Sequence, residues 1–103
     1  MNPFGNPQKL MKQLQQQQER MQREIAALSV EATSGGGMVR VVMNGEKKVD
    51  SLTIDPEVVN RDDVEMLQDL ILTAVNEAAH NVDQAIQEKL GGMMGGLKIP
   101  GMP

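Results

Sequence analysis

The chain of 103 residues contains no cysteine, tryptophan or tyrosine, and only one phenylalanine, Phe4. Without cysteine it has neither disulfides nor the thiolate ligands of a zinc framework. Nine methionines take the place of aromatic rings, and methionine fills space while specifying geometry weakly. A domain of this size with so weak a core is often stabilised by association, so we expect an oligomer.

Long apolar runs and catalytic combinations are also missing. No stretch approaches the roughly 18 apolar residues of a membrane span, and the N-terminus lacks the apolar core of a signal peptide. We therefore expect a cytoplasmic protein without a membrane partner. His80 is the only histidine, which leaves too few groups in one chain for a catalytic triad or a metal site. The sequence predicts no enzyme, no metal, no cofactor and no small-molecule substrate.

Charge is divided unevenly along the chain, whose formal net charge is −4. Residues 1–30 carry a net +2 and residues 31–54 are balanced, whereas residues 55–90 set nine carboxylates against two cations. A surface that binds a polyanion is therefore expected on the first segment rather than over the whole molecule.

The N-terminal segment has the signals of a long helix over residues 7–30. Asn6 is a good helix cap, and Pro7 suits the first helical position. Mostly apolar residues then recur at a 3-4 spacing, which is typical of a coiled-coil seam about three heptads long. An amphipathic helix packed on its own domain is the alternative. The seam consists of Met11, Leu14, Gln18, Met21, Ile25 and Leu28.

The middle of the chain favours β structure. The stretch "SVEAT" is a short candidate strand, and Gly35-Gly36-Gly37 is more typical of a turn than of a phosphate loop, because no Gly-Lys-Ser/Thr follows it. Asn44-Gly45 favours a two-residue type I′ hairpin turn with Gly45 at positive φ. That turn predicts the opposed pairs Met43–Glu46, Val41–Lys48 and Val39–Asp50.

The predicted hairpin has two unlike faces. The more apolar face is expected to form the core and carries Val39, Val41, Met43, Leu52 and Ile54. The other face mixes apolar with polar side chains. We expect this face, with Met38, Val42 and Val49, or the edge of the hairpin to meet a second subunit; an ordinary exposed face is the alternative.

A second helix of about 28 residues follows and is expected to end at Leu90. Asn60 or Asp62 is the expected cap, and Gly91-Gly92 the expected stop. Ala74 and Ala78 would let another backbone approach closely, so they join the predicted subunit interface. Residues 1–90 are expected to form one domain and residues 91–103 a flexible Gly/Met/Pro tail.

Four stretches, in order along nearly the whole chain, carry a family resemblance. They are "KQLQQQQERMQRE", "GGGMVRVVMNG", "IDPE" and "EMLQDLILTAVNEA". Together they resemble the YbaB/EbfC family of bacterial nucleoid-associated proteins. The resemblance implies an α+β fold with a long N-terminal helix, a small antiparallel sheet with a β-hairpin and a long C-terminal helix. It also implies an intertwined homodimer whose projecting helical arms bind DNA.

The same resemblance points to particular DNA-binding residues. The basic character expected of the first helix is matched by Lys9, Lys12, Arg20 and Arg23. Family members often carry basic residues midway along the second helix, where this chain has "HNVDQ", so Lys89 is the only candidate there.

The function implied is DNA binding in the nucleoid by a homodimer. Contact mainly with phosphates would give little sequence specificity, and such binding would influence nucleoid organisation and gene expression. The alternative is a prefoldin-like chaperone subunit or another coiled-coil interaction protein, because two helices flanking a hairpin and an acidic total charge also describe that class. Such arms would bind unfolded chains through apolar tips.

Overall fold

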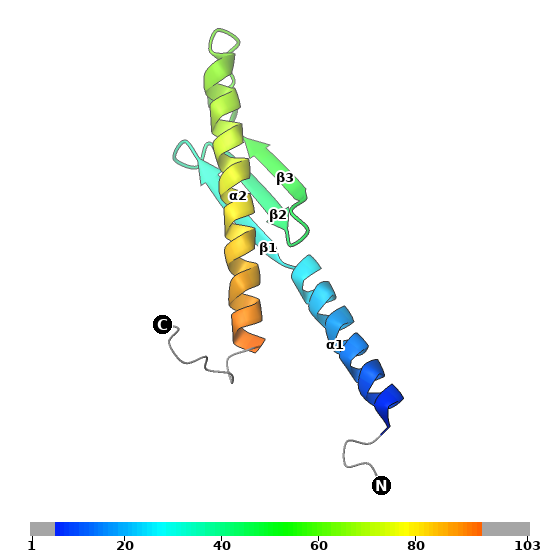
Figure 1. Cartoon of the computed structure of the whole chain (residues 1–103). Coiled ribbons are helices and arrows are strands. Elements are labelled where there is room, and N and C mark those ends of the chain that lie inside the picture. The colour runs from blue at the N-terminus through cyan, green and yellow to red at the C-terminus, as the bar shows by residue number, and fades with distance from the viewer. Residues whose placement is uncertain (1–5, 94–103) are drawn as a thin grey trace, which may run out of the picture.

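The structure is a computed structural model that describes residues 6–93. Its elements are α1 (Pro7–Ala26), β1 (Ser29–Ser34), β2 (Val39–Asn44), β3 (Val49–Ile54), a short 3-10 helix η1 (Pro56–Val58) and α2 (Val64–Met93). This order confirms the predicted α+β fold of a helix, a small antiparallel sheet and a second helix (Figure 1).

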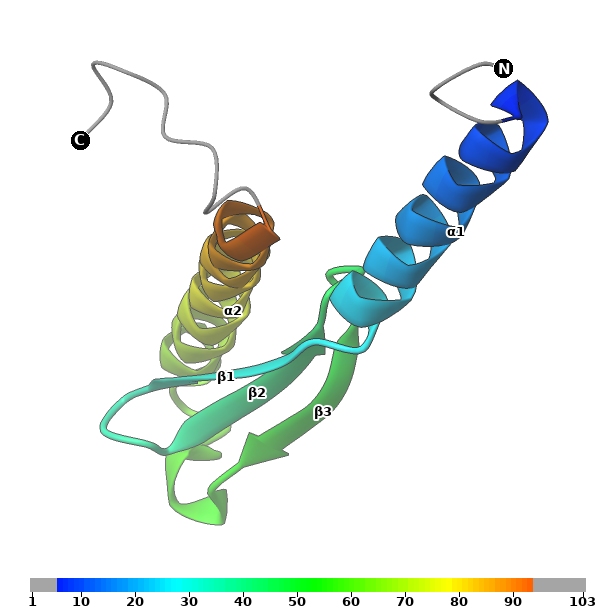
Figure 2. The ribbon, with the colours of Figure 1, turned by 90° about the horizontal axis from the view of Figure 1, so that it is seen from below.

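The sheet has three antiparallel strands in the order β1-β2-β3. The stretch "SVEAT" forms most of β1, as its alternation predicts, so the hairpin gains a third strand. Helix α2 lies across one face and packs on β1 and β2, whereas its contact with β3 is slight (Figure 2). One edge of the sheet therefore stays uncovered.

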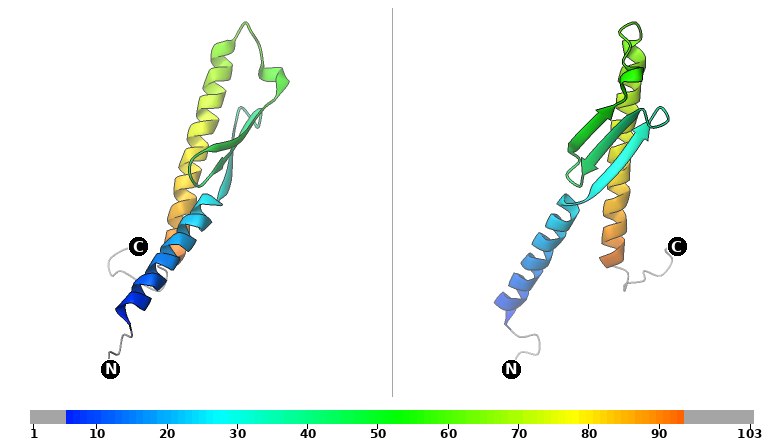
Figure 3. Two further views of the ribbon diagram at one scale, coloured as in Figure 1. Left: turned by 90° about the vertical axis from the view of Figure 1, so that its right-hand side faces the viewer. Right: turned by 180° about the vertical axis from the view of Figure 1, so that it is seen from behind.

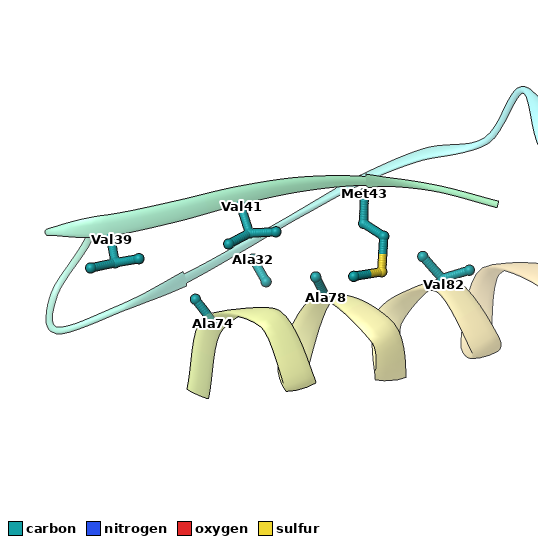
Figure 4. Close-up of a cluster of buried hydrophobic side chains, with 7 residues drawn as sticks. All are labelled: Ala32, Val39, Val41, Met43, Ala74, Ala78 and Val82. Carbon is teal, nitrogen blue, oxygen red and sulfur yellow. The ribbon is translucent and has the colours of Figure 1, made fainter. Parts of the chain in front are cut away.

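The core is a single layer of small side chains between the sheet and α2. Figure 4 shows Ala32, Val39, Val41 and Met43 on the strands facing Ala74, Ala78 and Val82 on the helix. Ala74 and Ala78 are 0% exposed. These alanines allow the sheet of the same protomer to pack closely against α2. We predicted them at a subunit interface, but their side chains are taken up by the protomer's own core.

The hairpin turn differs from the predicted two-residue type I′ turn. Lys47 N–H donates to the Asn44 carbonyl, and Asn44 N–H donates to the Lys48 carbonyl, which gives a three-residue loop, Gly45 to Lys47. The residue at positive φ is Lys47 (φ 62°), and Gly45 is not in that region. The predicted turn and its opposed pairs are therefore wrong.

The true register keeps most of the predicted faces. Val39 opposes Ile54 and Val41 opposes Leu52, so these residues share one face as predicted. Leu52, however, is exposed and does not join the core. An irregularity then places Met43 opposite Val49, which brings Val49 to the core side of the sheet. We had placed Val49 on the other face, and that placement is wrong because the pattern of apolar residues does not reveal a bulge.

Both helices end differently from the expected bounds. Helix α1 stops at Ala26, not at residue 30, because Ser29 and Val30 already pair with β2. The cap of α2 is Asp63, whose Oδ1 accepts from Met66 N–H at 3.2 Å, not Asn60 or Asp62. Helix α2 also continues through the predicted glycine stop to Met93. The rest of the predicted tail, residues 94–103, lies outside the described residues, as does Phe4.

The molecule is elongated. Its radius of gyration is 20.5 Å, against about 13 Å for a compact domain of this length. Helix α1 leaves the sheet beside the β2–β3 turn, and the C-terminal part of α2 runs past the sheet in the same general direction (Figure 3). Two helical arms thus project from one end of a thin body.

Candidate nucleic-acid interface

Helix α1 is a polar rod whose first turn is fixed by its cap. The Asn6 side chain accepts from Gln8 N–H at 3.0 Å, and Pro7 occupies the first turn, where its missing N–H costs nothing. The glutamines that follow are good helix formers. No residue of α1 is buried, and all of its residues from Pro7 to Arg20 are exposed to solvent or to a partner.

Four cations gather on one side of this rod. At 100° per residue Lys9, Lys12, Arg20 and Arg23 fall within an arc of about 80°, spread over about 21 Å of helix. All four are exposed. We call these four residues the basic stripe. The residues predicted from the sequence to bind DNA on the first helix are therefore brought together.

The residues of the basic stripe also differ from most other described cations in that they form no ion pair with a carboxylate. None of the four forms an ion pair with another residue of the range 6–93. Four of the remaining described cations are each within 4 Å of a carboxylate: Arg40–Glu31 (3.3 Å), Lys47–Asp83 (2.7 Å), Lys48–Glu46 (3.7 Å) and Lys89–Glu24 (3.8 Å). Described cations that are not within 4 Å of a carboxylate are thus concentrated on α1.

Lys89 stands apart from the stripe. Its ammonium lies 3.8 Å from the Glu24 carboxylate of α1, and its side chain is 32% exposed. A phosphate contact by Lys89 would compete with this pair. The structure does not group Lys89 with the other predicted DNA-binding residues.

Two glutamines that we did not single out belong to the same face. Gln16 lies at the centre of the basic stripe and Gln13 at its border, by the same 100° spacing. Their side-chain amides are exposed and can donate hydrogen bonds to phosphate oxygens. The signal for Gln16 was present in the sequence, since it continues the 3-4 spacing from Lys9 and Lys12 to Arg20.

The opposite side of α1 is apolar and open. The apolar seam, which within α1 consists of Met11, Leu14, Gln18, Met21 and Ile25, is centred about half a turn from the basic stripe. Met11 is 63% exposed and Leu14 is 55% exposed. Together with Leu90 of α2, the outer part of the seam lines a groove between the two arms.

The far end of α2 has the opposite charge. Asp63, Glu65 and Asp69 line a shallow hollow next to Ser34 and Gly35 at the start of the helix. Within residues 6–93 no group of three or more potential metal ligands is placed to hold an ion, and His80 is exposed on α2. Among the described helices, none is both long and apolar enough to cross a bilayer.

Comparison with known proteins identifies the family. The YbaB/EbfC DNA-binding family matches residues 2–97. The chain belongs to this family. The resemblance seen in "GGGMVRVVMNG" and "EMLQDLILTAVNEA" is thereby confirmed.

Nucleoid-associated proteins from several bacteria are similar to the chain over most of their length. A nucleoid-associated protein of Koribacter versatilis is 52% identical over 96 residues, covering 93% of this chain and 95% of that protein. A nucleoid-associated protein of Chloroflexus aurantiacus is 49% identical over 89 residues, covering 86% and 89% respectively.

The fold has also been seen in a crystal structure. An uncharacterized protein from Helicobacter pylori matches with a TM-score of 0.71 and 22% sequence identity. The match covers 91% of this chain and 99% of that chain. At this identity the comparison supports the fold alone.

Proposed function

We propose that this YbaB/EbfC protein binds double-stranded DNA in the nucleoid as a homodimer, with α1 of each protomer as the binding arm. The basic stripe carries this proposal. It places four exposed cations, none within 4 Å of a carboxylate of residues 6–93, on one face of a projecting helix in a chain whose net charge is −4. Phosphate neutralisation with release of counterions is the interaction that such a face can provide. Binding of this kind would influence nucleoid organisation and gene expression.

The charges beside the stripe favour contact with phosphates over base readout. Glu19 and Glu24 flank the basic stripe on either side of the helix, by the 100° spacing. A helix that enters the major groove has a phosphate backbone along each flank, and these two carboxylates would face it. The arm therefore suits the outside of the duplex, where long Lys and Arg side chains reach phosphates without reading bases.

Uncovered apolar surface supports the homodimer. Leu52 and Val49 lie on the core side of the sheet but are 45% and 44% exposed, because α2 does not cover β3. The apolar seam of α1 is open as well, and surfaces of this kind mark interaction sites. A second copy of the chain would cover both. Met38 and Val42, which we predicted at the interface, are half-buried and still partly accessible.

A salt titration with matched variants tests DNA binding. If about four of the dimer's eight stripe cations reach phosphates, log K against log salt has a slope of about −3 to −4. Replacement of Lys9, Lys12 and Arg20 by glutamine should flatten that slope to about −1 and weaken binding equally on unrelated sequences. The control replaces Arg40, Lys48 and Arg61 by glutamine, which removes the same charge outside the arm and should leave the slope unchanged.

Equal effects of the two triple variants would show that only net charge matters and would contradict the proposal. A slope near zero for the unchanged protein would remove DNA as the partner. In that case the exposed Leu10, Met11 and Leu14 at the outer end of α1 would favour the chaperone alternative. Suppression of the aggregation of an unfolded client protein measures that activity directly.

A further inference from the structure

Helix α1 is held to the rest of the protomer only near its C-terminal end. It has no buried residue, and its contacts with the sheet and α2 are few. Its last turn meets the β2–β3 turn and the C-terminal part of α2. The direction of the arm therefore depends on a small number of contacts there.

Gly45 makes the closest of these contacts. A Cβ atom added to Gly45 would overlap the carbonyl oxygen of Ile25, and it would lie 2.6 Å from the Ile25 carbonyl carbon and 3.3 Å from the Ala26 nitrogen. These are backbone atoms of α1, which cannot move aside as the end of a flexible side chain can. Gly45 is buried and does not have positive φ, so it is the close approach of α1 that requires a glycine here.

The turn that carries Gly45 is itself firmly held. Asn44 Oδ1 accepts from Glu46 N–H at 2.9 Å and from Lys48 N–H at 3.2 Å, while Asn44 Nδ2 donates to Asp50 Oδ1 at 3.2 Å. Lys47 Nζ lies 2.7 Å from Asp83 Oδ1 of α2. The turn is thus held by hydrogen bonds within it and by an ion pair to α2. We call the surface that Gly45 presents to the last turn of α1 the seat.

A second link joins the two helices directly. Glu24 in the last turns of α1 lies 3.8 Å from Lys89 of α2. The connection from Ala26 to the first residue of β1 consists of Ala27 and Leu28 alone. Without the seat and this link, the arm could pivot about that short connection.

We propose that the seat at Gly45 and the Glu24–Lys89 link form a joint that sets the direction of the arm, and thereby positions the basic stripe. This inference rests on the proposed function, because two stripes on one dimer can engage one duplex only if the arms are correctly spaced. A joint that holds the arms in advance avoids the cost of ordering them on binding. Gly45, Glu24 and Lys89 are thus positioning residues, while the basic stripe touches the DNA.

Distances between spin labels test the joint without DNA. The chain has no cysteine, so Gln13→Cys on α1 and Glu77→Cys on α2 can be labelled alone, with excess unlabelled chain added to dilute labelled pairs. Gly45→Ala should shift and broaden the distance distribution. The same substitution in the unlabelled protein should weaken DNA binding about tenfold while leaving the salt slope unchanged, since the same cations contact phosphates.

Two further variants keep the result interpretable. Gly36→Ala also strains a turn, since Gly36 has φ 67°, but nothing lies within 4 Å of the added atom, so it should lower stability without moving the arm. Should Gly45→Ala fail to fold, Glu24→Lys should broaden the distribution, and adding Lys89→Glu should narrow it again. Only the distances are compared in these two variants, because Glu24→Lys also adds a cation beside the basic stripe and would change DNA affinity by its charge.

A distance distribution that is the same in the Gly45→Ala and Gly36→Ala proteins would overturn the proposal. A Gly45→Ala protein whose label distances change while its DNA affinity does not would overturn it as well. Loss of salt-dependent DNA binding in the unsubstituted protein contradicts the proposed function instead, and in that case the distances alone still decide whether the joint exists.

Discussion

The two helices of this protein have similar sequence periodicity but different surroundings. Helix α2 packs its small apolar residues on the sheet and has Ala74, Ala78 and Val82 fully buried. Helix α1 has an apolar line of comparable spacing and buries none of it. The comparison shows that a periodic apolar face predicts packing against another element. It does not tell whether that element belongs to the same chain or to a partner.

Charge separates the two helices in the same way. The basic stripe of α1 has no partner within the described part of the chain, whereas Lys89 of α2 is paired with Glu24. The start of α2 is acidic, with Asp63 as the cap and Glu65 in the first turn, which suits the helix dipole. Lys89 and the acidic start of α2 thus have an explanation within the protomer, whereas the cations of the basic stripe have no such ion pair within residues 6–93.

The largest expected effect tests the buried side of this comparison. Ala78→Asp places a carboxylate in a 0% exposed site between α2 and the sheet, where nothing can pair with it. We expect the free energy of unfolding to fall by about 3–5 kcal/mol. The control, Gln16→Asp on exposed α1, should change it by less than about 0.5 kcal/mol. Thermal and urea unfolding followed by circular dichroism measures both, and comparable losses would mean that α1 is packed as α2 is.

The next effect concerns the surface that α2 leaves open. Leu52→Glu puts a charge on the uncovered core side of β3 and should weaken dimerisation by about 2–3 kcal/mol, the cost typical of a central interface residue. The unchanged chain should sediment at about twice its 11.3 kDa mass. The control is Asn76→Glu on the exposed face of α2, away from the sheet. A monomeric unchanged protein with intact helices, or a Leu52→Glu dimer as stable as the control, would contradict the proposed interface.

A smaller effect is expected at the place where α1 meets the body. Asn44→Ala removes the acceptor for Glu46 N–H and Lys48 N–H and should destabilise the fold by about 1–2 kcal/mol. Asn60→Ala is a matched control, because Asn60 accepts only from Asp62 N–H, before α2 begins. Chemical denaturation compares the two variants. If Asn44→Ala lowers the free energy of unfolding no more than Asn60→Ala does, the hairpin turn is not rigid enough to position α1.

Much of the fold could be predicted from local patterns. Asn6-Pro7 located the start of α1, and the alternation of Val39, Val41 and Met43 located the core face of β2. The hairpin turn could not be predicted correctly, because Asn-Gly is favoured in two-residue turns and the need for Gly45 comes from distant Ile25. Gly45 is needed because α1 approaches it closely, whereas the local rule had explained the glycine by positive φ in a type I′ turn.

The candidate site was predictable for a related reason. An exposed face has no packing to distort its pattern, so the spacing of Lys9, Lys12, Arg20 and Arg23 translates directly into one side of α1. The pairing of Lys89 with Glu24 could not be predicted, because the two residues are 65 positions apart in the sequence and only the fold brings them together.

The smallest expected effect tests whether the face of α1, rather than its charge, decides DNA binding. Gln16→Lys adds a cation at the centre of the basic stripe, and each added phosphate contact steepens the salt slope by about 0.9. We expect DNA affinity at low salt to rise about threefold, since the new charges are exposed and screened. Gln15→Lys is the control, because it adds the same charge about 100° around the same helix, beside the groove. Fluorescence anisotropy over a range of salt concentrations measures both variants. Equal gains would show that α1 attracts DNA only through its net charge, whereas a gain confined to Gln16→Lys would place the duplex along the stripe.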